Sequence, residues 1–115
     1  MSDQCIFCKI INRQIPSDIL HEDELVVAFR DINAQAPVHL LIVPRIHIPN
    51  LNELLPEHSA ILGHIHLAAK SLANESGLAE TGWRLVINCG PDACQSVLHL
   101  HVHLLGGRQM SGRMA

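Results

Sequence analysis

The chain has 115 residues, which suits one compact domain and is too short for two. Hydrophobic residues make up 48% of it, and 8 basic against 11 acidic residues give a formal net charge of −3 without any Lys/Arg cluster. This composition predicts a compact soluble protein and argues against nucleic acid or a membrane as a partner. A small anion remains open as a ligand, because backbone N–H groups and histidines can hold a phosphate.

The first residues lack the basic start and apolar core of a secretory signal, and no apolar run approaches the roughly 20 residues of a membrane span. We therefore expect a cytoplasmic protein, with a single domain over residues 1–115 that ends in a polar tail at 108–115. In the cytoplasm the four cysteines, Cys5, Cys8, Cys89 and Cys94, are expected to be free thiols or metal ligands rather than disulfides.

The first predicted element is a short helix over residues 5–12, where Phe7, Ile10 and Ile11 recur at helical spacing before Pro16 forbids continuation. It opens with a Cys-x-x-Cys pair, whose thiolates can bind one zinc ion if two more ligands come from elsewhere. The alternatives are two free cysteines on a helix, or a site made by all four cysteines.

Strands are predicted next. The apolar runs 19–21 and 25–29, separated by acidic residues, indicate an antiparallel hairpin. Residues 38–44 are almost wholly apolar, which predicts a strand buried on both faces or packed under a helix. Asp31 stands where the hairpin ends, in an Asp-x-Asn sequence that is also ordinary turn chemistry.

A short helical turn is predicted at 51–55, followed by a long helix from Pro56 to about Ser76 that Gly77 ends. Its apolar residues follow the 3.6-residue period, so one face should pack on the sheet. A further strand at 84–88 leads into a loop at 90–96. The expected fold class is therefore α+β, with an antiparallel sheet of about five strands, one long helix and one short helix.

The stretch 95–107 carries His99, His101 and His103 in alternation with apolar residues, which predicts a last strand after the loop at 90–96. A strand rises roughly 3.3 Å per residue, so neighbouring imidazoles would lie about 7 Å apart on one face. All three could then surround one phosphate or metal ion. Packing alone does not explain them, because each buried imidazole needs hydrogen-bond partners.

This triad and its flanking blocks resemble the histidine-triad (HIT) superfamily, in particular its HINT branch of nucleotide-binding phosphoramidases. The similarity spans nearly the whole chain. Its blocks are Ile6-Phe7-x-Lys9-Ile10-Ile11, Glu22-Asp23, Ala28-Phe29-x-Asp31-Ile32, Gln35-Ala36-Pro37-x-His39, Ile42-Val43-Pro44, Val86-Ile87-Asn88, Gln95-Ser96, His99-x-His101-x-His103 and Leu104-Leu105-Gly106-Gly107.

The resemblance implies hydrolysis of purine nucleoside phosphoramidates through a nucleotidyl-histidine intermediate. His101 would be the nucleophile, His103 would bind a phosphate oxygen, His99 would hold the shape of the site, and Ser96 would relay a proton to the leaving nitrogen. The Asp31 carboxylate would accept hydrogen bonds from both ribose hydroxyls. The remaining nucleotide contacts implied are Phe7, Ile10, Phe29, Ile32, Asn88 and Gln95.

The resemblance also implies a structural zinc ion held by Cys5, Cys8, His47 and His99, and a homodimer in which long helices and edge strands meet. No catalytic metal is required, since no carboxylate pair stands near the triad. One departure concerns the loop before the triad: Ala93-Cys94 stands where typical HINT members carry Gly, and these side chains could crowd the phosphate.

Three other functions fit the same residues. The three histidines could hold a catalytic zinc with an open water position. A histidine nucleophile could instead act on dinucleoside polyphosphates or nucleotidyl sugars. The chain could also bind AMP as a regulatory or scaffold protein without catalysis, although binding alone does not need a nucleophile.

Overall fold

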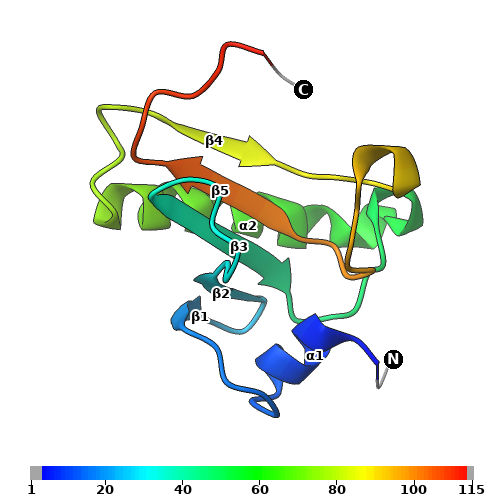
Figure 1. The fold of residues 1–115 in the computed structure, drawn as a ribbon. Coiled ribbons are helices and arrows are strands. Elements are labelled where there is room, and N and C mark those ends of the chain that lie inside the picture. The colour runs from blue at the N-terminus through cyan, green and yellow to red at the C-terminus, as the bar shows by residue number, and fades with distance from the viewer. Residues whose placement is uncertain (1–3, 114–115) are drawn as a thin grey trace.

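The computed structural model of the chain describes residues 4–113 and has the expected α+β fold (Figure 1). Two α-helices accompany one five-stranded antiparallel sheet with the strand order β1-β2-β3-β5-β4. The strands are β1 (Ile19–Glu22), β2 (Val26–Arg30), β3 (Val38–Pro44), β4 (Trp83–Val86) and β5 (Val102–Gly106), and the helices are α1 (Ile6–Ile11) and α2 (Ser59–Glu75).

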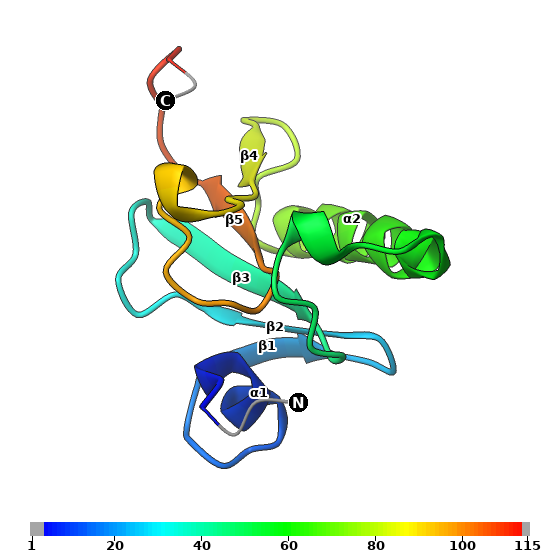
Figure 2. The same ribbon diagram turned by 90° about the vertical axis from the view of Figure 1, so that its right-hand side faces the viewer.

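The long helix α2 packs on one face of the sheet, as its apolar period predicts (Figure 2). Its buried residues meet one set of alternate residues from β2, β3 and β5. The predicted helix starts slightly too early, because Pro56–His58 forms a 3₁₀ turn before Ser59, and Leu51–Glu53 forms another such turn. Gly77, with φ +77°, follows the helix in a conformation that suits glycine.

The short helix α1 packs on the opposite face of the sheet. Phe7, Cys8 and Ile10 are buried there against Leu41 and Val43 of β3 and the matching residues of β2. Successive residues of β3 therefore enter different cores, with Leu40 and Ile42 facing α2. The prediction that 38–44 is buried on both faces is confirmed.

The predicted strand after the loop at 90–96 is wrong in its first part, because β5 begins only at Val102 and His99 and His101 precede it. The register pairs Ile42 with Val102, so Pro44 would face Leu100, and proline has no N–H to extend the ladder. The N–H of Leu100 donates instead to the Ile48 carbonyl at 2.7 Å. The alternation of inward and outward side chains continues before β5 begins, since Leu100, Val102 and Leu104 all enter the core beneath α2.

None of the helices within residues 4–113 is both long and apolar enough to span a membrane. Of the predicted tail, residues 108–113 form no helix or strand, and the Arg84 guanidinium donates to the Ser111 carbonyl at 2.9 Å. Residues 114–115 lie outside the described range.

Candidate active site and metal-binding group

His101 lies just before β5, buried against α1, with its ring 5.1 Å from that of Phe7. Its Nδ1 lies 2.7 Å from the carbonyl oxygen of His99. A carbonyl only accepts hydrogen bonds, so Nδ1 carries the proton and a neutral ring leaves a lone pair on Nε2. Nε2 is the nitrogen that a nucleophilic imidazole needs free.

His103, on β5, belongs to a second hydrogen-bonded set with His39 of β3 and Asp31 at the end of β2. His103 is paired with Leu41 across the sheet, and His39 is two residues further along β3 on the same face. The Nε2 of His39 lies 2.9 Å from Nδ1 of His103 and 3.3 Å from Oδ2 of Asp31. The ring of His103 also lies 5.1 Å from that of His101.

A hollow of about 490 Å³ opens beside these histidines, between α1 and the segment before β5. Eight of the predicted site residues line it: Phe7, Ile10, Phe29, Asp31, Ile32, Ser96, His101 and His103. Its walls, which also include His39 and Ser17, thus combine apolar and aromatic side chains with a carboxylate, two hydroxyls and three imidazoles. Such a combination fits a ligand that has an apolar ring at one end and polar groups at the other.

Three of the predicted catalytic and nucleotide-binding residues, His99, Asn88 and Gln95, do not line this hollow. The backbone N–H of Gln95 donates to the Gly90 carbonyl, and its side-chain amide is bonded to the Gly90 N–H and the Pro49 and Val97 carbonyls. Gln95 therefore holds the shape of the loop.

The expected crowding by Ala93-Cys94 is absent from this hollow, because neither residue lines it. Cys94 is exposed and adopts a left-handed conformation with φ +60°, which ordinarily favours glycine. The presence of Cys94 instead of glycine therefore strains the backbone but does not fill space beside the histidines.

Burial shapes the acid–base properties of the two bonded histidines. Desolvation, reinforced by His101 and His39, lowers the pKa of His103 to about 4. Desolvation also lowers the pKa of His39, although nearby Asp31 opposes this shift. Both rings are therefore neutral near pH 7, so His103 can offer a polarised N–H but not a full positive charge.

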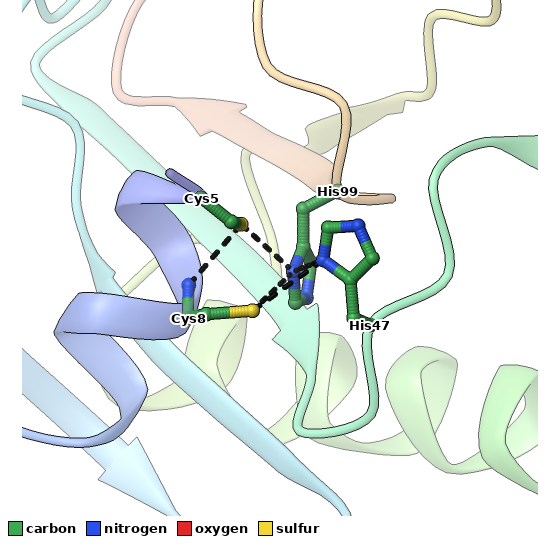
Figure 3. A group of neighbouring side chains, drawn as sticks. All are labelled: Cys5, Cys8, His47 and His99. Carbon is green, nitrogen blue, oxygen red and sulfur yellow. Dashed lines mark hydrogen bonds between the residues drawn. The ribbon is translucent and has the colours of Figure 1, made fainter. Parts of the chain in front are cut away.

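His99 faces a different group of side chains, shown in Figure 3. Its Nε2 donates to the Pro44 carbonyl at 2.8 Å, which leaves the Nδ1 lone pair directed at Cys5, Cys8 and His47. The side chains come from α1, the segment after β3 and the segment before β5, and converge from three directions.

The spacing of these four ligand atoms suits a tetrahedral metal ion. The two Nδ1 atoms lie 3.2 Å apart, and three of the four N···S separations are 3.4, 3.4 and 3.6 Å. Zinc bonds of about 2.05 Å to nitrogen and 2.3 Å to sulfur would require about 3.3 and 3.6 Å. Burial and the neighbouring Cys5 raise the pKa of the Cys8 thiol to about 11, so binding of a metal ion must displace a proton.

The alternative of a catalytic metal held by all three triad histidines does not fit this geometry. Among residues 4–113, two groups could hold a metal ion, the Cys5/Cys8/His47/His99 group and Asp31/His39/His103, and His101 belongs to neither. His99 is turned toward the cysteines, and the expectation that all three rings surround one ligand is wrong. A site made by all four cysteines is likewise absent from these groups.

Comparisons with known proteins agree with this geometry. A family model described as scavenger mRNA decapping enzyme C-term binding matches residues 4–115. Purine nucleoside phosphoramidase of Escherichia coli strain K12 is 48% identical over 115 residues, which cover 100% of this chain and 97% of that protein. The chain belongs to the histidine-triad (HIT) family. A solved HIT family hydrolase from Clostridium thermocellum superposes with a TM-score of 0.97, at 50% identity and with all of both chains covered.

A further relative bears on the Cys5/Cys8/His47/His99 group. The 14 kDa zinc-binding protein of Zea mays is 54% identical over 108 residues, covering 92% of this chain and 84% of that protein. Together these similarities confirm the predicted family, its HINT branch and the predicted hydrolase class.

His39 is the functional candidate that sequence reasoning did not single out. It was noticed only as part of a matching block, yet it is the one polar residue in the buried strand β3. A histidine in an otherwise apolar strand needs hydrogen-bond partners, and this requirement was the available signal.

Proposed function

We propose that this HIT protein hydrolyses purine nucleoside phosphoramidates through a nucleotidyl group carried on His101. One observation carries the proposal: the His99 carbonyl fixes the proton on Nδ1 of His101 and leaves Nε2 unprotonated beside a hollow that also contains Asp31 and His103. The name of the E. coli relative suggests the bond that is cleaved.

In the first step Nε2 of His101 attacks phosphorus, the P–N bond breaks, and the leaving nitrogen takes a proton and departs as an amine. In the second step water attacks the same phosphorus, the P–Nε2 bond breaks, and the nucleoside monophosphate is released. Two displacements replace one difficult hydrolysis, and His101 is regenerated. The N–H on Nε2 of His103 would bind the phosphoryl oxygen that gains charge in each transition state.

The other residues bind and position the substrate. The Asp31 carboxylate offers acceptors to the two ribose hydroxyls, while Phe7, Ile10, Phe29 and Ile32 surround the base. The exposed Ser96 hydroxyl would pass a proton to the leaving nitrogen. In this proposal Asn88 contacts the leaving group from the other end of the loop, and Gln95 keeps that loop in shape.

Cys5, Cys8, His47 and His99 would hold a zinc ion, for which their spacing is suitable. With all four positions taken by protein ligands, its contribution would be to tie α1 to the segments around the active site. His99 thereby positions the nucleophile, because its own carbonyl holds the His101 ring.

The proposal includes a homodimer formed by α2 and the edge strand β4. Within residues 4–113, β4 pairs with β5 alone and so has one free edge. Leu67 of α2 is 66% exposed, which leaves an apolar side chain for a second copy to cover. Sedimentation at several protein concentrations tests this arrangement.

The function is tested by mixing the protein with adenosine 5′-phosphoramidate and stopping the reaction within the first turnover. Intact-mass spectrometry is expected to show one added adenylyl group, and peptide mapping should locate it on His101. Steady-state assays should show release of AMP and the amine. Turnover without an adduct, together with full activity of His101→Ala, would contradict the proposal; AMP binding without any turnover would favour a binding protein.

A further inference from the structure

We propose that His39 is a positioning residue that fixes the tautomer of His103, and that Asp31 shares the same His39 proton, so that sugar binding affects the phosphate contact. This inference rests on the proposed function, since it assigns Asp31 to the ribose and His103 to the phosphoryl group. It adds a coupling between the two ends of the substrate.

The tautomer of His39 follows from a backbone contact. The N–H of Gln35 lies 2.9 Å from Nδ1 of His39. A backbone N–H can only donate, so Nδ1 must be the unprotonated nitrogen and the ring must be neutral, with its proton on Nε2. Desolvation, which lowers the pKa of His39, favours this same neutral form.

The tautomer of His103 follows in turn. The proton on Nε2 of His39 points at Nδ1 of His103, 2.9 Å away, so Nδ1 of His103 accepts. Its remaining proton then resides on Nε2, where it can bind a phosphoryl oxygen. The opposite tautomer would put two protons between the rings and remove the donor from Nε2. The backbone N–H of Gln35 thus determines, through His39, which nitrogen of His103 is a donor.

Little of the His39 ring is open to water, because the residue is only 5% exposed and its side chain only 3%, although it lines the hollow. The same contacts argue against a metal ion at Asp31, His39 and His103, although their ligand atoms are close enough for one. A metal ion would need the lone pair that Nε2 of His39 does not have while Gln35 donates to Nδ1.

Asp31 competes for the shared proton. Its Oδ1 accepts from the Asn33 N–H at 2.8 Å, and its Oδ2 lies 3.3 Å from Nε2 of His39. Ribose hydroxyls that donate to this carboxylate would reduce its attraction for the His39 proton, and the bond to His103 would strengthen. A substrate without those hydroxyls should therefore lose part of the rate as well as binding.

The tautomers of His39 and His103 can be measured directly by NMR. In the full-length wild-type protein, the ring ¹⁵N resonances of His103 should show a protonated Nε2 and an unprotonated Nδ1, and those of His39 should show the same. A proton on Nδ1 of His103 in the wild type would overturn the inference, and this measurement requires no variant and no turnover.

Kinetics provide the second test. His39→Phe keeps a ring of similar size but has no donor, and should lower kcat about tenfold or more while KM for adenosine 5′-phosphoramidate changes less than about threefold. His39→Gln, whose side-chain amide can donate from nearly the same position, should recover part of kcat. Equal kcat values for the wild type and His39→Phe would refute the positioning role.

The coupling is tested with adenosine 5′-phosphoramidate and its 2′,3′-dideoxy analogue. In the wild type the analogue should have a several-fold lower kcat, and in His39→Phe the two substrates should have nearly equal kcat. An unchanged ratio in His39→Phe would show that Asp31 acts on binding alone. If the wild type turned over neither substrate, the proposed function would fail, whereas the resonances of His39 and His103 would still decide the tautomers.

Discussion

The ring of His101 and the backbone of His99 are joined by a hydrogen bond of 2.7 Å, while the ring of His99 is turned toward Cys5 and Cys8. A single residue therefore contacts the Cys5/Cys8/His47 side chains with its ring and orients the His101 ring with its carbonyl. The Cys5/Cys8/His47/His99 group and Nε2 of His101, the proposed nucleophile, are thus connected through two residues of chain.

Replacing His101 by alanine should abolish adduct formation and lower kcat by about 10⁴-fold or more, because the proposed mechanism assigns the attack on phosphorus to His101. Rapid-quench kinetics and intact-mass measurements check this. His66→Ala is the matched control, since His66 is an exposed histidine of α2 outside the hollow and should leave kcat unchanged. AMP affinity of His101→Ala, measured calorimetrically, should remain within about tenfold of wild type.

Replacing Cys5 or Cys8 by serine should lower the zinc content and the melting temperature, because four converging ligand atoms would be reduced to three. Elemental analysis and calorimetric unfolding check both effects. Cys94→Ser serves as control, as Cys94 is exposed and belongs to no metal-binding group. Equal zinc content in Cys8→Ser and Cys94→Ser would rule out the proposed site.

The stability of the protein should fall between pH 6.5 and 4 in part because of His103. Burial, with His101 and His39 nearby, lowers the pKa of His103 to about 4, whereas the pKa of a histidine in an unfolded chain is about 6.5. Within this window the unfolded state binds a proton that the folded state does not. The contribution of neutral His103 to the free energy of unfolding is complete above the pKa that the residue has in the unfolded state. It is lost progressively as the pH falls toward its pKa in the folded state.

Urea unfolding of wild type and His103→Asn across this pH range, under identical zinc conditions, checks this expectation. The free energy of unfolding should decrease more steeply with falling pH in the wild type. Parallel curves would mean that His103 is protonated equally in both states.

Asp23 should clamp the β1–β2 turn to α2. Its Oδ2 lies 2.7 Å from Nε2 of both His21 and His64, and its Oδ1 accepts from the N–H groups of Leu25 and Val26. Burial alone would raise the pKa of Asp23, but the hydrogen bonds from His64, His21 and the two N–H groups hold it well below its usual range.

Asp23→Ala should therefore lower the free energy of unfolding by about 2 kcal/mol at pH 7. Because the folded pKa is depressed, this contribution is complete above the unfolded value of about 4 and shrinks below it. Asp18→Ala is the control: Asp18 pairs with Arg30 at an exposed position and should cost less than about 1 kcal/mol. Similar losses in the two variants would show that Asp23 is an ordinary surface carboxylate.

The amino-acid sequence alone determined the elements of this fold whose signals are local. Period-two and period-3.6 patterns predicted the strands and α2, and Pro56 and Gly77 marked the limits of the long helix to within a few residues. The triad, Asp31 and the Cys5-x-x-Cys8 pair stood out as candidate site residues, because their residue types are costly in a core and useful in a site.

Only the tertiary structure decided how these side chains divide into separate groups. Local alternation predicted one face for three histidines, and they do lie opposite the α2 core, but long-range contacts divide them: His99 faces Cys5, Cys8 and His47, whereas His101 and His103 line the hollow. The partner of His103 comes from β3, 64 residues earlier, through strand register. Which nitrogen carries a proton depends on such long-range contacts, and no local pattern encodes them.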